Sequence, residues 1–102
     1  MGSFEILAKL LEHGFRFCDF EAYPRCVGVE RNNFVALLEK TPEGGLRPQG
    51  SSGYLMGGKI GVLVERQGQS FFQAKQEEVS ATPEMLEAYR RFQEELREMF
   101  AS

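Results

Sequence analysis

The segment GYLMGGKIGVLVERQGQSFFQAKQ, residues 53–76, decides the fold. It holds three apolar runs, rich in β-branched and aromatic residues, that alternate with a period near two. The runs are separated by Gly57 and Gly58 and by Gln67, Gly68 and Gln69, which are short enough for hairpin turns. Tight turns require antiparallel neighbours. The segment therefore predicts three consecutive antiparallel strands, at 53–56, 59–66 and 70–76.

Two further strands precede this segment. Period-two alternation predicts strands at 25–30 and 34–40, joined by a short turn at Asn32 and Asn33. Residues 41–52, TPEGGLRPQGSS, then hold two prolines, three glycines and two serines. This composition predicts a long loop with a short edge segment at Leu46.

Both ends of the chain carry helical patterns. A helix at about residues 4–13 is predicted by apolar residues at helical spacing, namely Phe4, Leu7, Leu10 and Leu11. Gly14 can take the left-handed conformation that ends a helix, and Phe15 can then fold back onto the last turn.

The C-terminal helix begins after Thr82, which can cap it, with Pro83 at the first helical position. On its solvent side we expect i,i+4 ion pairs of Glu87 with Arg91 and of Arg91 with Glu95. Its opposite side is an apolar stripe made of Leu86, Tyr89, Phe92, Leu96, Met99 and Phe100.

These elements predict a single α+β domain that spans residues 1–102. The order is an N-terminal helix, an antiparallel meander of five to six strands, and a long amphipathic C-terminal helix. Two arrangements bury both helical stripes: a curved sheet covered on one face by the helices, or a half-barrel closed by the C-terminal helix. A chain of 102 residues is too short for two independent cores.

Residues 53–59 also fit G-x-x-x-x-G-K, the pattern of a phosphate-binding loop, with Gly53, Gly58 and Lys59 in the fixed positions. The context contradicts a nucleotide site. Ile60 stands where a Ser or Thr should hold magnesium, and a strand follows where a helix is needed. We interpret Gly57 and Gly58 as a hairpin turn.

The charge pattern disfavours nucleic acid and anionic membranes as partners. The formal net charge is −3, and the twelve Lys and Arg residues are scattered among fifteen acids. No apolar run approaches the ~20 residues that span a bilayer, so we expect a cytoplasmic protein. Fourteen of the acids are Glu, a composition that resembles that of heat-adapted proteins.

Residues 14–26, GFRFCDFEAYPRC, concentrate aromatic, charged and thiol side chains. A metal site at His13, Cys18 and Cys26 is a weak alternative, because the cysteines lack the short ligand spacing of structural zinc. A redox pair lacks the C-x-x-C spacing. We expect the thiols to pack as small apolar groups and His13 to interact with the negative helix end. We expect no metal or cofactor, and no catalytic set can be assembled.

We expect a non-catalytic binding or protein-interaction module that self-associates as a homodimer or binds another protein. Nine Phe, three Tyr and four Met exceed what so small a core needs to bury. The C-terminal stripe and the aromatic segment are the expected surfaces. The alternative is a small enzyme or small-molecule-binding protein with a pocket between sheet and helix. The candidate binding residues are Arg16, Phe17, Phe20, Tyr23, Arg25 and Tyr54.

Overall fold

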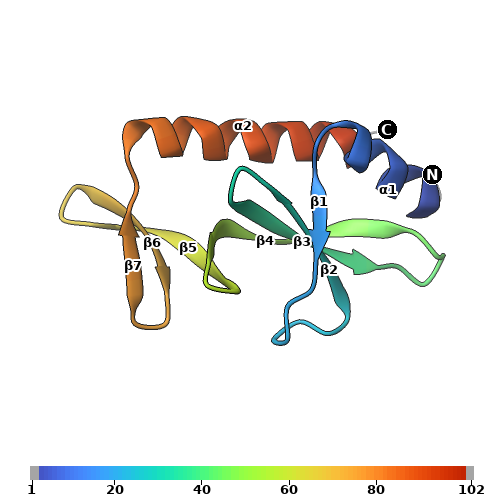
Figure 1. Ribbon diagram of the computed structural model, residues 1–102, viewed down its shortest axis with the longest axis horizontal. Coiled ribbons are helices and arrows are strands. Elements are labelled where there is room, and N and C mark those ends of the chain that lie inside the picture. The colour runs from blue at the N-terminus through green and yellow to red at the C-terminus, as the bar shows by residue number, and fades with distance from the viewer. Residues whose placement is uncertain (1–2, 101–102) are drawn as a thin grey trace.

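The computed structural model describes residues 3–100, without the side chains of residues 3, 50 and 51. In chain order, one helix precedes seven strands and a second helix follows them (Figure 1). The elements are α1 (Ser3–Glu12), β1 (Arg16–Cys18), β2 (Cys26–Arg31), β3 (Phe34–Lys40), β4 (Leu46–Met56), β5 (Lys59–Arg66), β6 (Gln69–Ala74), β7 (Glu77–Ser80) and α2 (Pro83–Phe100).

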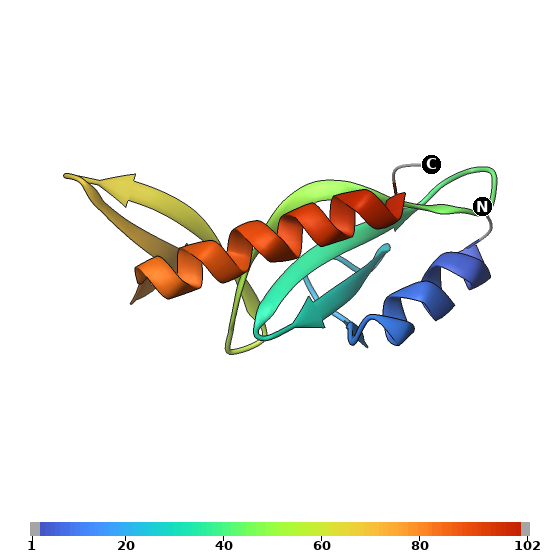
Figure 2. The ribbon, with the colours of Figure 1, turned by 90° about the horizontal axis from the view of Figure 1, so that it is seen from above.

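The strands form one antiparallel meander in the order β1 to β7, which confirms the predicted α+β class. The sheet curls into a half-barrel, and β5 joins its two parts. Strand β5 pairs with β4 through its first residues and with β6 through its last ones. The β5–β6–β7 unit therefore leads away from β1–β4, as Figures 1 and 2 show.

Helix α2 lies across one face of both parts of the sheet (Figure 1). Its buried side chains are Tyr89, Phe92, Leu96 and Met99. Aromatic rings from the sheet meet them: Phe34 stacks on Tyr89, and Phe72 meets the same ring edge-on, each with centroids 5.4 Å apart. This aromatic layer holds the two parts of the sheet together, since aromatic pairs add stability beyond their buried area.

A smaller cluster lies apart from this core. Phe20, from the segment between β1 and β2, packs with Val35 and Leu37 of β3. A Cβ atom at Gly28 would stand 2.6 Å from the Phe20 ring. Glycine at position 28 thus leaves the space that the ring occupies.

The predicted helix ends are confirmed. Gly14 has a φ of 84°, the Gly14 N–H donates to the Leu11 carbonyl, and the Phe15 N–H donates to the Leu10 carbonyl. These two bonds make a Schellman ending. At the start of α2, the Thr82 side chain accepts a hydrogen bond from the Met85 N–H at 3.2 Å.

The strand count and one loop differ from the sequence prediction. Residues 46–52, expected in a loop, belong to the long strand β4. Strand β3 pairs with them on one side, and their other side is a free edge, where a strand can accept a proline such as Pro48. Strands β1 and β7 were not predicted. The turn before β7 uses Lys75 at a φ of 54°, which no glycine or asparagine marks in the sequence.

The buried face of the N-terminal helix overlaps the predicted stripe only in part, because Leu10 lies in both. Ile6 and Leu10 are buried, whereas Phe4 is 83% and Leu11 57% exposed. Helix α1 contacts only one end of the molecule, next to the C-terminal part of α2 (Figure 2). A narrow contact covers one side of a helix and leaves the rest in solvent.

Candidate functional site

The six candidate residues do not converge on one place. Phe20 is buried in the small cluster, and Tyr23 lies near it in an exposed segment. Phe17 is exposed on β1, and Arg16 precedes it in the strand. Tyr54 packs in the aromatic layer on Phe34 and Phe72, with ring centroids 5.6 and 5.4 Å apart. Arg25 lines a cavity of about 740 Å³ beside Cys26.

The cysteines pack against the protein's interior, and His13 binds the end of α1. Cys18 and Cys26 are free thiols that both pack against the small cluster. Burial raises the pKa of the Cys18 thiol, and the Glu30 and Asp19 carboxylates raise it further. The His13 ring bonds to the Lys9 carbonyl at 2.9 Å, at the end of α1. Among residues 3–100, no group of three His, Cys, Asp or Glu side chains could hold a metal ion.

The apolar stripe of α2, expected as an interaction surface, is instead part of the protein's own core. Tyr89, Phe92, Leu96 and Met99 are buried against the sheet. That expectation is wrong because the sheet lies beneath α2 (Figure 1) and buries these four of the six stripe residues, while Leu86 and Phe100 are half-buried.

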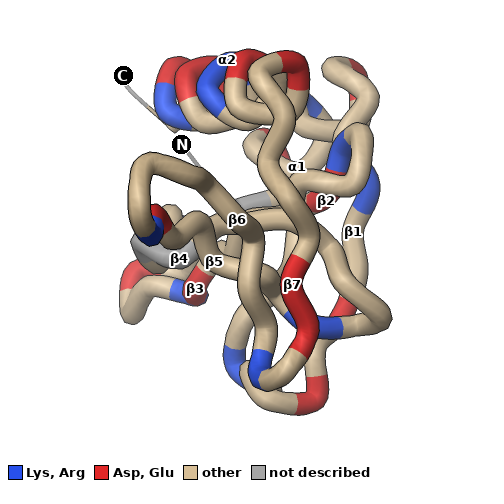
Figure 3. Tube along the Cα trace, turned by 90° about the vertical axis from the view of Figure 1, so that its left-hand side faces the viewer, with Lys and Arg blue, Asp and Glu red and all other residues tan. Residues whose placement is uncertain are grey.

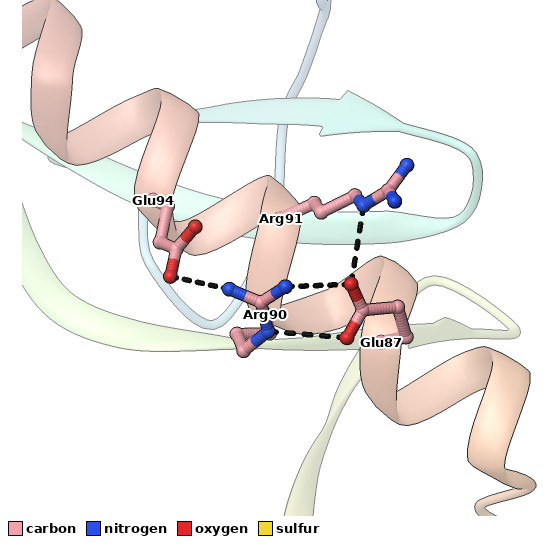
Figure 4. A network of polar contacts seen from close by, with 4 residues as sticks. All are labelled: Glu87, Arg90, Arg91 and Glu94. Atoms are coloured by element: carbon pink, nitrogen blue, oxygen red, sulfur yellow. Dashed lines mark hydrogen bonds and ion pairs between the residues drawn. The ribbon is translucent and has the colours of Figure 1, made fainter.

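The solvent side of α2 carries a network of four charged residues (Figure 4). Arg90 binds Glu87 and Glu94, with nitrogen–oxygen distances of 2.6 Å, and Arg91 binds Glu87 at 3.2 Å. Hydrogen bonds from Arg90 and then from Arg91 lower the pKa of the Glu87 carboxyl. The predicted pair of Arg91 with Glu95 is replaced by one of Arg31 with Glu95. The network supports the helix and leaves no free cationic stripe there.

Arg31 joins three elements. Besides Glu95 of α2, its guanidinium reaches the His13 carbonyl at 3.2 Å and lies 4.3 Å from the centre of the Phe15 ring. A cavity of about 700 Å³ opens beside it, between the β2–β3 turn and α2. None of the six candidate residues lines this cavity, although a pocket between sheet and helix was expected. We interpret Arg31 as a structural joint.

The most unusual feature of the sheet is the place where β4 and β5 separate. They pair at three positions only, from Tyr54 with Gly61 to Met56 with Lys59. A Cβ atom at Gly53 would stand 2.1 Å from the Gly61 carbonyl oxygen. Only glycine allows the two backbones to come so close before they diverge.

Helix α2 satisfies the β4 side of this separation. If pairing continued past Gly61, Ser52 would stand opposite Leu63. Instead the Tyr89 hydroxyl donates a hydrogen bond to the Ser52 carbonyl at 3.0 Å and accepts one from the Ser52 hydroxyl at 2.8 Å. Gln93 donates to the Ser52 hydroxyl at 3.3 Å. Side chains of α2 thus bind β4 where a strand would otherwise bind.

The β5 side has no such cover among residues 3–100. The turn after β5 has positive φ at Gln67 (53°) and Gly68 (76°), and Arg66 stands opposite Gln69. In this type I′ hairpin the flanking pair is hydrogen-bonded, and hydrogen-bonded pairs alternate along the ladder. The N–H and C=O groups of Leu63 and Glu65 therefore point away from β6, to the open edge.

A hydrogen bond on the far side of β6 supports this alternation. Ser70 stands opposite Glu65, and the Ser70 carbonyl accepts from the Ala81 N–H at 2.9 Å. Ser70 thus directs its backbone away from β5, which is the geometry of a non-hydrogen-bonded pair.

Apolar side chains flank the open edge on both faces of the sheet. Val62 is 47% and Leu63 39% exposed, and neighbouring residues of a strand point to opposite faces. Leu63 stands opposite the buried Phe72, so it extends the core face to the edge. This edge, residues 62–66 of β5, exposes backbone and apolar side chains together.

The other strand edges in the described chain are protected. Strand β1 is three residues long, and β7 is short and carries Glu77 and Glu78, seen as red segments in Figure 3. Strand β4 has Pro48, which lacks an N–H, in addition to the cover from Tyr89. Short length, charge and proline are the usual means of preventing strand pairing. Residues 62–64 of β5 have none of them.

Sequence reasoning missed this edge. Val62 and Leu63 fit an ordinary internal strand, because alternation gives no information on where a neighbouring strand leaves. The available signal was the pair Gly53 and Gly61, since glycine inside a strand marks a close backbone approach.

Among residues 3–100, no helix is both long and apolar enough to span a membrane. None of the comparisons, with protein-family models, with curated proteins and with solved structures, finds a match to this chain.

Proposed function

We propose that this protein is a non-catalytic protein-interaction module that self-associates. The observation that carries the proposal is the unprotected edge of β5, where Val62 and Leu63 are exposed beside backbone groups without a strand partner. Exposed strand edges pair with other strands unless the protein prevents it.

The distribution of polar groups favours this role over catalysis. The most extensive charged cluster, around Arg90, lies on the outer side of α2 and consists of ion pairs within the helix. Five of the eight arginines pair with glutamates, so little cationic surface is left for nucleic acid. We further propose that the protein acts in the cytoplasm.

Light scattering coupled to size-exclusion chromatography tests the proposal. We expect the molar mass to rise from that of a monomer to that of a dimer as protein concentration increases. Leu63→Lys should suppress this rise, because a lysine at a strand edge opposes pairing. Phe4→Lys makes the same chemical change at an exposed apolar position of α1 and should leave the rise intact. A strict monomer at millimolar concentration would refute self-association.

A second candidate function is small-molecule binding, supported by a cavity of about 650 Å³. Its lining includes Phe20, Tyr23 and Asp19 from the aromatic segment, Lys59 from the start of β5, and Lys75 from the turn between β6 and β7. Both signs of charge beside apolar walls suit a ligand that carries both charges. A thermal-shift screen of amino acids and other zwitterions tests this role, and no shift in melting temperature would count against it.

A further inference from the structure

We infer that the open edge of β5 pairs with β5 of a second copy, antiparallel about a two-fold axis at Val64. This inference rests on the proposed self-association and adds its geometry. In this arrangement Leu63 of each copy exchanges two backbone hydrogen bonds with Glu65 of the other. The two β5–β6–β7 units then form one continuous six-stranded sheet.

The direction of the backbone groups decides which residues of β5 can pair with a second strand. Only residues whose N–H and C=O point to the open edge can bond a second strand, and in residues 62–66 these are Leu63 and Glu65. Figure 2 shows β5 on the outer side of the β5–β6–β7 unit, away from β7. The incoming strand needs the same pattern of donors and acceptors, which β5 itself supplies.

The register of the two β5 strands follows from their charges and their free backbone groups. Two-fold pairing can centre on Leu63, on Val64 or on Glu65. A centre at Glu65 sets two glutamates directly opposite each other, which is destabilising. A centre at Leu63 sets Glu65 opposite Gly61, whose backbone groups already face Tyr54 of β4. That register leaves one bonded pair, whereas the centre at Val64 gives two.

The side chains that face each other in this register are compatible. With the centre at Val64, the two Val64 side chains meet on one face, and Val62 stands opposite Arg66 of the second copy. Arg66 already binds Glu78 and lies 5.0 Å from the Phe71 ring centre, so its stem can cover Val62 while its charge is paired. On the other face Leu63 meets the stem of Glu65. No like charges stand directly opposite each other.

Cysteine cross-linking tests the register. In a Cys18→Ser, Cys26→Ser background, single Val64→Cys, Val62→Cys, Leu63→Cys and Glu65→Cys variants are oxidised, and the covalent dimer is measured by non-reducing electrophoresis. Facing residues of a non-hydrogen-bonded pair have Cα atoms about 4.5 Å apart, within the range of a disulfide. The two Val62 residues would be four strand positions apart, about 13 Å. We therefore expect rapid cross-linking of Val64→Cys and little of Val62→Cys.

The outcomes separate the register from the self-association. A dimer by light scattering that cross-links fastest at Leu63→Cys or Glu65→Cys overturns the register and leaves the proposed function standing. A monomer at every concentration, with no cross-link, overturns both. Because the serine background removes two packed thiols, sedimentation equilibrium of Leu63→Lys in the native background is the second measurement. It should raise the dimer dissociation constant at least about tenfold, equivalent to about 1.4 kcal/mol, and an unchanged constant contradicts the β5 interface.

Discussion

Replacing Tyr89 with phenylalanine should destabilise the protein by about 2 kcal/mol. The ring would remain in the aromatic layer, stacked on Phe34 and edge-on to Phe72. The change removes the hydroxyl that donates to the Ser52 carbonyl at 3.0 Å and accepts from the Ser52 hydroxyl at 2.8 Å. One net hydrogen bond contributes about 1 kcal/mol, and a buried acceptor left without a donor costs about 1–3 kcal/mol. For about 100 residues, 2 kcal/mol lowers the melting temperature by roughly 10 °C.

Tyr54→Phe is the matched control. Tyr54 stacks in the same aromatic layer, and its hydroxyl makes no hydrogen bond to the groups that the structure describes. We expect this change to alter the free energy of unfolding by less than about 0.5 kcal/mol. Urea denaturation at one fixed protein concentration measures both, since dimerisation adds a concentration-dependent term. Equal effects of the two substitutions would refute the role of Tyr89 in satisfying the edge of β4.

Three further predictions concern other parts of the molecule. Gly53→Ala places a Cβ 2.1 Å from the Gly61 carbonyl oxygen and should lower the urea midpoint more than Gly57→Ala, whose Cβ meets no atom within 4 Å and which adds only the strain of a positive φ, about 1–2 kcal/mol. In a Cys26→Ser variant, the raised pKa of Cys18 should make its alkylation at pH 8 slower than that of a free cysteine; an equal rate contradicts its burial. The lowered pKa of Glu87 means that its stabilising effect is complete above the unfolded-state pKa and disappears as pH falls through the folded-state pKa. Glu87→Gln should therefore lower the melting temperature slightly at pH 7 and by less at pH 3, and a larger effect at pH 3 would contradict this.

Local signals in the sequence predicted much of the fold. Gly14 predicted the end of α1, Thr82 predicted the start of α2, and Gly57 with Gly58 predicted the hairpin turn between β4 and β5. Each of these positions needs a specific backbone conformation or a capping side chain, which the residue type reveals. Strand β7 was not predicted, because Lys75 takes its left-handed conformation without a characteristic turn residue.

Non-local features could not be predicted in the same way. The stripe of α2 and the stripe of α1 look equally apolar in the sequence, yet most of the first is buried and Phe4 of the second is exposed. Whether an apolar face is covered depends on where the sheet curls and its strands separate, and β4 and β5 separate at Gly53 and Gly61. The candidate site follows from that separation, so it lies on β5 and not in the aromatic segment that the sequence pattern favoured.

Amide hydrogen exchange followed by NMR at low and high protein concentration tests the central claim most directly. In the dilute protein, Val62 and Val64 should be protected by β6, whereas Leu63 and Glu65 should exchange rapidly at the open edge. At high concentration, Leu63 and Glu65 should become protected as β5 pairs with a second copy. Rapid exchange of these two amides in a sample that light scattering shows to be dimeric would contradict the account.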